Sequence, residues 1–242
     1  MTLLRSILYL VCMGVSVALY ASLILILSPF LQKGFLSRIA THWGWVNLGL
    51  LRFICGLSYE VRGLEKLHQS EVPSIIMVKH QSAWETIALR GLLPWNQAWV
   101  LKKELLAYPF FGWALRATGQ IAIDRSQGKK ALSTLFERGI VALQQGFNVI
   151  IFPEGTRTPF GSKGKYHQGG AMLAERSQAQ VIPIAHNAGL LWPKGFIIQP
   201  GVVQLVIGEP IPTQGLKARE IGTRIEQQIE SEMDRLVGST KH

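Results

Sequence analysis

An uncharged segment of 27 residues near the amino terminus, Ser6–Gln32, constrains this chain more than any other feature. As a helix it is on the order of 40 Å long, which exceeds the roughly 30 Å hydrocarbon core of a bilayer. A secretory signal is the alternative, because Arg5 supplies a short basic stretch before the segment. The apolar run is longer than a usual signal core, and no clear Ala-x-Ala cleavage site follows it. The sequence therefore favours an uncleaved membrane anchor.

A second apolar stretch, Phe35–Leu57, contains two Trp residues, Trp43 and Trp45, and only three basic ones. This pattern fits a helix lying at the level of the lipid headgroups, and a buried amphipathic helix is the alternative. Basic residues are sparse before the first segment, where Arg5 stands alone, and more frequent after it, at Lys33, Arg38 and Arg52. The positive-inside rule then predicts that the C-terminal body lies in the cytoplasm, on the inner membrane. A first helix that dips into the bilayer without crossing it leaves this location unchanged.

Residues 58–242 are predicted to form one α/β domain behind an apolar helical anchor of residues 1–57. Short apolar runs bounded by Gly, Pro or polar residues are typical of buried strands. They lie at Ser74–Val78, Ala98–Leu101, Gln120–Ile123, Phe147–Phe152, Val181–Ala185 and Val202–Ile207. Helical segments are predicted at Ala83–Leu92, Lys129–Gln145, Gly170–Arg176 and Leu216–Val237. This alternation predicts a mostly parallel sheet flanked by helices.

Charge and composition narrow the function classes. The hydrophobic fraction of 48% excludes a disordered chain. The net charge of +10 suits an anionic lipid surface or an acidic partner. A nucleic-acid partner is not expected, because the basic residues form no stripe and no recognition motif is evident. Cys12 and Cys55 lie in apolar stretches, so neither a disulfide framework nor a zinc site is expected, and a reducing cytosolic setting is the default.

The first candidate catalytic pair is His80 and Glu85, which directly follow the predicted strand Ser74–Val78. Residues five apart on one continuous helix point away from each other, so the two meet only if His80 precedes the helix and Glu85 lies in its first turn. Ser82 is a good N-cap, and Ser82-x-x-Glu85 is a capping-box pattern that supplies this helix start. In the functional interpretation Glu85 fixes the imidazole tautomer and leaves the other ring nitrogen as a base. The alternative is that Glu85 only caps the helix.

The second candidate is the turn Pro153–Thr158, which follows another predicted strand. Gly155 permits close backbone approach to a ligand, Thr156 offers a hydroxyl and an amide, and Arg157 can bind a phosphate with two hydrogen bonds. With Glu154 at its start, this turn is a candidate phosphate-binding segment, and plain connection chemistry is the alternative. It is neither a P-loop nor a dinucleotide-binding glycine motif.

Lys102 and Arg125 are further candidates for the phosphate-binding set, because each follows a predicted strand. The carboxyl ends of parallel strands meet at one edge of a sheet, where ligands usually bind. A solvated surface position is the alternative for each residue taken singly.

These segments together resemble the glycerolipid acyltransferase family, and within it the bacterial 1-acyl-sn-glycerol-3-phosphate acyltransferases. Five blocks match in order: His80–Glu85; Lys102–Leu105 with Pro109–Gly112; Gly119–Arg125; Glu154–Arg157; and Val181–Ile184. Glu85 is a departure, because the family usually has Asp at this position. The longer side chain requires a shift of the helix start or of the His80 rotamer, and we expect the pairing to survive.

The resemblance implies acyl transfer from a thioester of acyl-carrier protein or coenzyme A to the sn-2 hydroxyl of lysophosphatidate, making phosphatidate for phospholipid synthesis. His80 is then the base and Glu85 its partner, while Arg157, Arg125, Lys102, Thr156, Gly155 and Glu154 form the phosphate-binding set. No metal or cofactor is expected. The alternatives are an acyltransferase for another lysophospholipid and a non-catalytic, membrane-anchored module that binds anionic lipid.

Overall fold

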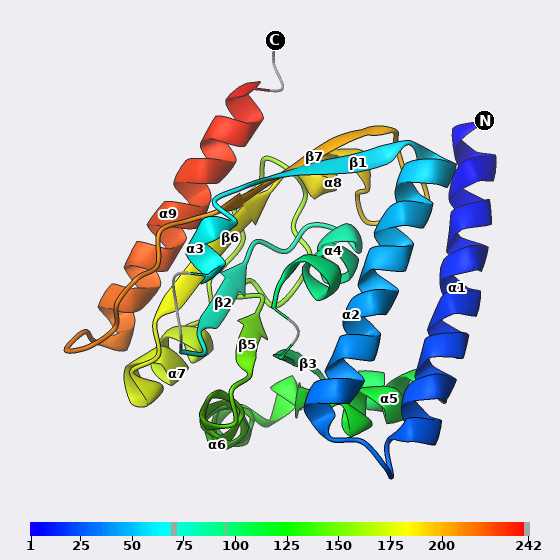
Figure 1. The fold of residues 1–242 in the computed structure, drawn as a ribbon. Coiled ribbons are helices and arrows are strands. Elements are labelled where there is room, and N and C mark those ends of the chain that lie inside the picture. The colour runs from blue at the N-terminus through cyan, green and yellow to red at the C-terminus, as the bar shows by residue number, and fades with distance from the viewer. Residues whose placement is uncertain (69–71, 95, 240–242) are drawn as a thin grey trace.

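The computed structural model describes residues 1–68, 72–94 and 96–239, and contains one seven-stranded sheet (Figure 1). The strands are β1 (Leu57–Arg62), β2 (Ile75–Val78), β3 (Gln97–Lys102), β4 (Ile121–Ile123), β5 (Asn148–Ile151), β6 (Val181–His186) and β7 (Gly201–Ile207). Their order is β1-β7-β6-β2-β5-β3-β4. The pairing is parallel except between β6 and β7, which confirms the predicted mostly parallel sheet.

The strand β1 was not predicted, whereas the six predicted strands all form. It is an edge strand whose residues alternate irregularly between buried and exposed, and it contains the charged residues Glu60 and Arg62. A continuous apolar run marks a strand that is buried on both faces, so the search for such runs passes over a half-exposed edge strand.

Helices surround this sheet. They are α1 (Thr2–Leu27), α2 (Lys33–Leu50), α3 (Glu65–His68), α4 (Trp84–Leu92), α5 (Phe111–Ala117), α6 (Lys129–Gln144), α7 (Gly169–Ser177), α8 (Ala188–Leu191) and α9 (Ala218–Ser239). A π-helical turn, η1 (Leu51–Cys55), continues α2, and the 3₁₀ turns η2 (Lys103–Ala107) and η3 (Arg125–Gln127) follow β3 and β4.

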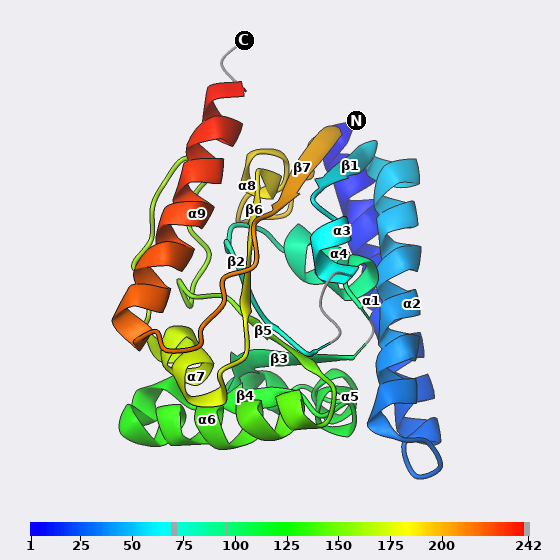
Figure 2. The ribbon, with the colours of Figure 1, turned by 60° about the vertical axis from the view of Figure 1, so that its left-hand side comes forward.

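Both faces of the central strands are buried. On β2, Ile76 and Val78 belong to one hydrophobic cluster, whereas Ile75 and Met77 belong to another. The first cluster includes residues of α1, α2, α4 and α8, and the second includes residues of α6, α7 and α9. Figure 2 shows α2 and α4 on one side of the sheet and α7 and α9 on the other. Successive side chains of a strand point to opposite faces, so this period of two gives each face its own core.

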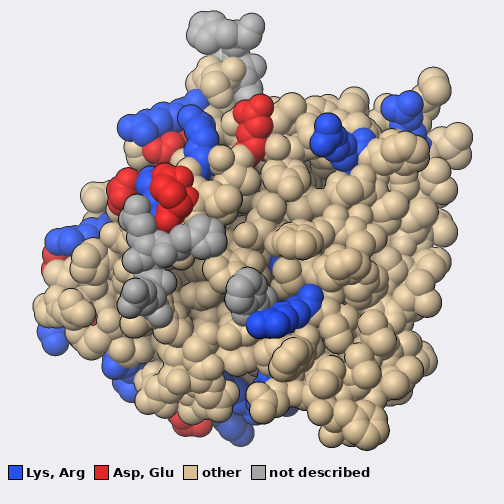
Figure 3. Space-filling model, viewed as in Figure 1, with Lys and Arg blue, Asp and Glu red and all other residues tan. Residues whose placement is uncertain are grey.

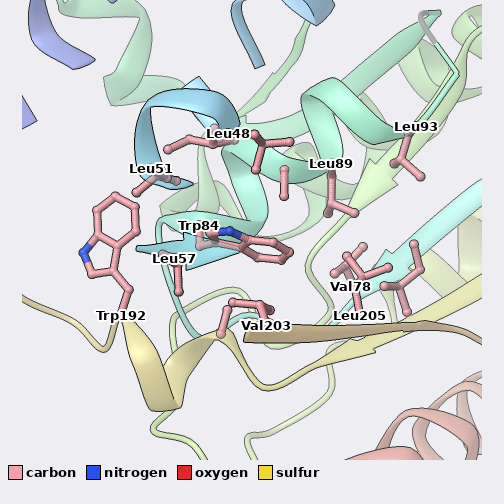
Figure 4. Packing of buried hydrophobic residues seen from close by; sticks show 14 of the residues in the cluster. Leu48, Leu51, Leu57, Val78, Trp84, Leu89, Leu93, Trp192, Val203 and Leu205 are labelled. Atoms are coloured by element: carbon pink, nitrogen blue, oxygen red, sulfur yellow. The ribbon is translucent and has the colours of Figure 1, made fainter. Parts of the chain in front are cut away.

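The aromatic ring of Trp84, the first residue of α4, lies in the first cluster (Figure 4). It is completely buried, among side chains from α2, β1, β2 and β7. Complete burial of such a ring contributes roughly 2–3 kcal/mol from the apolar area alone. This packing fixes the start of α4, and with it the residues that lead into the helix.

The predicted apolar anchor forms two long helices. α1 is long and apolar enough to cross a membrane, and its outward face exposes large apolar side chains such as Leu4, Val11 and Leu19. Figure 3 shows that the surface over α1 and α2 carries few charged side chains. The inward face of the pair joins the first hydrophobic cluster through Tyr9 and Leu48. The boundary drawn between residues 57 and 58 stays a prediction, because α1, α2 and the sheet share this core.

Candidate active site

His80 lies where the central strand β2 ends and α4 has not yet begun. The chain leaves β2 after Val78, and α4 starts at Trp84, within one residue of the predicted start. The N-cap is Ala83 and not the predicted Ser82, which lies one residue earlier. The Nδ1 atom of His80 lies 2.8 Å from Oε1 of Glu85. The predicted contact is therefore confirmed, and the longer Glu side chain spans the distance. The imidazole is 16% exposed, while the Glu85 carboxylate is fully buried.

The Glu85 carboxylate both holds the chain at the start of α4 and contacts His80, so the two alternative roles are compatible. Oε1 of Glu85 also accepts hydrogen bonds from the backbone N–H groups of Gln81 and Ser82, each at 2.9 Å. In return, Oγ of Ser82 accepts the N–H of Trp84 at 3.0 Å. The bond from Trp84 satisfies a donor that the first turn of a helix leaves free, and the bonds from Gln81 and Ser82 fix the turn that leads into α4. Glu85 is thus fixed by the helix start before it meets His80.

The surroundings of Glu85 determine the protonation of the pair. Burial by itself raises the pKa of Glu85, but His186 and the hydrogen bonds from His80 and Ser82 lower it, and the lowering prevails. An ionised carboxylate only accepts hydrogen bonds, so the proton of a neutral His80 ring is on Nδ1. Its Nε2 atom then carries a free lone pair. The ring also stacks on Phe152, with centroids 4.1 Å apart, and this contact fixes its plane.

The turn after β5 holds the backbone of His80 from both sides. Oε2 of Glu154 accepts the N–H of His80 at 2.9 Å, and the N–H of Thr158 donates to the His80 carbonyl at 2.8 Å. Oε1 of Glu154 contacts the hydroxyl of Thr158 at 3.0 Å and the ammonium of Lys79 at 2.8 Å. These contacts give Glu154 a positioning role. Its predicted contact with a phosphate is untested, and a buried, occupied carboxylate offers no donor to an anion.

Lys79 and Glu230 belong to this network, and neither was among the residues predicted from the sequence. Lys79 is completely buried, and its ammonium lies 2.8 Å from Glu230 of α9 and 3.1 Å from the Ser162 carbonyl. The Tyr166 hydroxyl donates to the same Glu230 oxygen at 2.7 Å. One feature of the sequence could have revealed Lys79: it directly follows a fully apolar strand, and a lysine that is buried there needs an acidic partner.

A groove of about 840 Å³ runs along the carboxyl edge of the sheet beside the pair. Its lining includes five of the six residues predicted to bind phosphate: Lys102, Arg125, Glu154, Gly155 and Thr156. Phe152, the ring that stacks on His80, also lines it. We call the part formed by Lys102, Arg125, Gly155 and Thr156 the cationic groove, and the acidic residues Glu104 and Glu154 line other parts of the same cavity.

Gly155 is required by the shape of this groove. Its φ of +68° is one that residues with a side chain rarely adopt, and a Cβ there would lie 3.2 Å from a guanidinium nitrogen of Arg125. The Arg125 guanidinium donates a hydrogen bond to the Gly155 carbonyl. The turn after β5 and the residues after β4 are thereby joined into one wall.

Arg157 is the predicted phosphate-binding residue that does not line the groove. It is exposed, and within the described part of the chain it makes no hydrogen bond or ion pair. Its neighbours are engaged on the two sides, Thr156 in the groove and Thr158 with the His80 carbonyl. Arg157 therefore lies in the chain between a residue of the groove and a residue that contacts His80.

Comparisons with known proteins identify the family of this chain. The profile of the family described as "Acyltransferase" matches residues 58–187. A 1-acyl-sn-glycerol-3-phosphate acyltransferase of Pseudomonas aeruginosa is 44% identical over 90% of this chain and 84% of its own length. A protein of the same name from Helicobacter pylori is 36% identical over 55% of this chain and 57% of its own length.

The crystal structure of the 1-acyl-sn-glycerophosphate acyltransferase from Thermotoga maritima has the same fold, with a TM-score of 0.81 at 23% identity. The match covers 97% of this chain and 95% of that one. The family profile and the Pseudomonas relative together show that this chain belongs to the acyltransferase family.

Proposed function

We propose that this acyltransferase transfers a fatty acyl group from an acyl thioester to the sn-2 hydroxyl of 1-acyl-sn-glycerol-3-phosphate, making phosphatidic acid. The names of the Pseudomonas and Helicobacter relatives support this acceptor. The observation that carries the proposal is the His80–Glu85 pair, joined through the Phe152 ring to a groove with two cationic side chains. Such a groove suits a phosphate, and the histidine beside it suits an alcohol that must lose a proton.

In the proposed reaction Nε2 of His80 takes the proton of the acceptor hydroxyl as its oxygen attacks the thioester carbonyl. A carbon–oxygen bond forms, and the tetrahedral intermediate then collapses with loss of the carbon–sulfur bond. The thiolate leaves and receives the proton from the imidazolium, which Glu85 stabilises in the meantime. A covalent acyl-enzyme is not needed, and Cys12 and Cys55 both lie in the N-terminal helices. These steps require neither a metal nor a cofactor.

The acceptor phosphate is proposed to lie in the cationic groove. Lys102 and Arg125 supply positive charge, and Gly155 and Thr156 supply backbone and hydroxyl groups. Arg157 can reach the same anion from the rim of the turn. Holding the phosphate there orients the glycerol hydroxyl toward His80, and such orientation accounts for a large part of many catalytic rate enhancements.

The membrane position is also part of the proposal. The exposed apolar face of α1 fits a bilayer, and the basic residues after α1 favour a site that faces the cytoplasm. Lysophosphatidate is then reached from the anionic leaflet, and acyl-carrier protein or coenzyme A delivers the acyl group from the cytoplasmic side. The net charge of +10 attracts both the leaflet and an acidic carrier protein.

The test is thioester-dependent conversion of lysophosphatidate to phosphatidate by the purified protein and by His80→Ala. The wild type is expected to be active, and loss of the base is expected to lower kcat by about 10²–10⁴-fold. Acyl-carrier-protein and coenzyme A thioesters are compared in the same assay, together with other lysophospholipids as acceptors. A His80→Ala variant with wild-type kcat contradicts the mechanism, and faster acylation of another lysophospholipid contradicts the acceptor.

A further inference from the structure

His186 is a buried histidine that the proposed reaction does not use. It is the last residue of β6, the strand that pairs with β2, and its side chain is fully buried. Its Nε2 atom lies 2.8 Å from the carbonyl oxygen of Lys79, and its Nδ1 atom lies 3.2 Å from the N–H of Ala188.

These two partners fix the protonation of the ring. A carbonyl oxygen only accepts, so Nε2 carries the proton, and a backbone N–H only donates, so Nδ1 is the acceptor. His186 is therefore neutral, and both ring nitrogens are engaged. Burial, its largest influence, lowers the pKa of His186, which agrees with this assignment.

The carbonyl that His186 holds belongs to the peptide group directly before His80. The N–H of that same peptide group donates to Glu154 Oε2 at 2.9 Å. A peptide group is planar and rigid, so fixing its oxygen and its N–H fixes the plane from which His80 begins. The preceding N–H, of Lys79, is also tied, to the Ile184 carbonyl of β6 at 3.0 Å.

His186 also borders the carboxylate that orients His80. Its Nε2 atom lies 3.9 Å from Oε2 of Glu85, an oxygen with no hydrogen-bond partner within the described residues. The other carboxylate oxygen, Oε1, receives His80. One buried carboxylate is thus bordered by two imidazoles, and the Nε2–H group of the neutral His186 lies on its Oε2 side.

We propose that His186 is a positioning residue for His80: its Nε2–H holds the Lys79–His80 peptide group against Glu154 and sets the approach of the catalytic imidazole to the acceptor hydroxyl. This inference rests on the proposed role of His80 as the base. His186 touches neither substrate nor reacting atoms in this account, and its effect passes through the backbone of His80.

Two substitutions at His186 separate this role from simple packing. In His186→Gln the amide nitrogen reaches the position of Nε2 and can still donate to the Lys79 carbonyl. In His186→Asn the shorter side chain keeps an acceptor near Nδ1 for Ala188 but leaves the Lys79 carbonyl without its donor. A matched control is His42→Asn, which removes an exposed histidine that bonds Tyr20 in the N-terminal helices.

His186→Asn is expected to lower kcat 10- to 100-fold with KM for lysophosphatidate within twofold, because small displacements of a catalytic group have effects of this size. His186→Gln is expected to stay within about threefold of wild type, and His42→Asn to be unchanged. Thermal unfolding in detergent is followed for each variant, and activity is expressed per folded protein.

The inference is overturned if both His186 variants keep the wild-type kcat, if Gln is as inactive as Asn while folded, or if the loss appears in KM alone. The same assay includes His80→Ala, which keeps the two claims separable. An active His80→Ala contradicts the proposed base, whereas an inactive His80→Ala beside a fully active His186→Asn contradicts only the role of His186.

Discussion

The two halves of the candidate site share one edge of the sheet but are built differently. In the buried half, the His80–Glu85 pair and its supports Lys79, Glu154 and His186 are joined by contacts of 2.8–2.9 Å between protein groups. In the cationic groove, Lys102 is exposed and makes no hydrogen bond or ion pair within the described residues. One half is fixed before substrate arrives, and the other keeps the Lys102 ammonium available for a ligand.

This contrast has a kinetic consequence. Interactions that orient the base matter most in the transition state, so disturbing the buried half is expected to lower kcat. Interactions with the phosphate are made in the ground state as well, so disturbing the groove is expected to raise KM. Variants in each half test this assignment of kcat effects to the buried half and KM effects to the groove.

The largest effect on stability is expected from Lys79→Met. The substitution leaves the carboxylates of Glu154 and Glu230 facing each other without their shared cation. Removing one partner of a buried ion pair costs about 3–5 kcal/mol of unfolding free energy. Chemical denaturation in detergent measures it, with Lys217→Met as the control, since Lys217 pairs with Glu175 at the surface and is 86% exposed. Equal stability of the two variants contradicts the proposed importance of the buried network.

The next effect is expected in the groove, from Arg125→Gln. Loss of a charged hydrogen-bond donor to the phosphate is expected to raise KM for lysophosphatidate about tenfold, with kcat within twofold. Arg138→Gln, on the exposed face of α6, is the control and is expected to change neither constant. Arg157→Gln is measured in the same series to test whether Arg157 also contacts the phosphate. An increase in KM for Arg157→Gln alone means that the phosphate lies outside the cationic groove.

A smaller effect is expected from pH, through His186. Burial lowers its pKa, so below about pH 6.5 the unfolded chain binds a proton here that the native chain does not. Native stability from this group is complete above pH 6.5 and is lost as the pH falls. Between pH 7.5 and 5.5 the wild type is expected to lose more unfolding free energy than His186→Gln, by at most about 1.4 kcal/mol, the limit reached when native His186 stays neutral throughout. The pKa of Glu85 is lowered, so Glu85 stays ionised over this window and adds little.

Denaturation curves of both proteins at the two pH values provide the measurement. The other histidines are the same in both chains, so their contributions cancel in the difference. Parallel pH dependences of the two proteins contradict the neutral, buried state assigned to His186.

The sequence predicted what depends on local pattern. The His80–Glu85 contact follows from a strand end, a serine just before the helix and a five-residue spacing, and all three lie within one short segment. The central strands were found because burial on both faces leaves continuous apolar runs. The residues at the carboxyl edge of the sheet were expected to gather there, and five of the six predicted phosphate-binding residues do line one groove.

What the sequence did not predict depends on contacts between distant segments. Lys79 meets Glu230 across 151 positions, and His186 meets the Lys79 carbonyl across 107. Neither contact can be predicted from the spacing of residues along the sequence. Arg157 was predicted to bind the phosphate because a guanidinium can form two hydrogen bonds to it. Successive residues of a turn point in different directions, however, and only the fold decides which of them line the groove.

The central claim is that the charge of Glu85 holds His80 as the base, and kcat and KM of Glu85→Gln test it most directly. Glutamine keeps an oxygen that accepts the N–H groups of Gln81 and Ser82, so the helix start and the fold are expected to persist. We expect kcat to fall at least 10²-fold, with KM for lysophosphatidate within twofold. A folded Glu85→Gln protein with the kcat of the wild type contradicts the account.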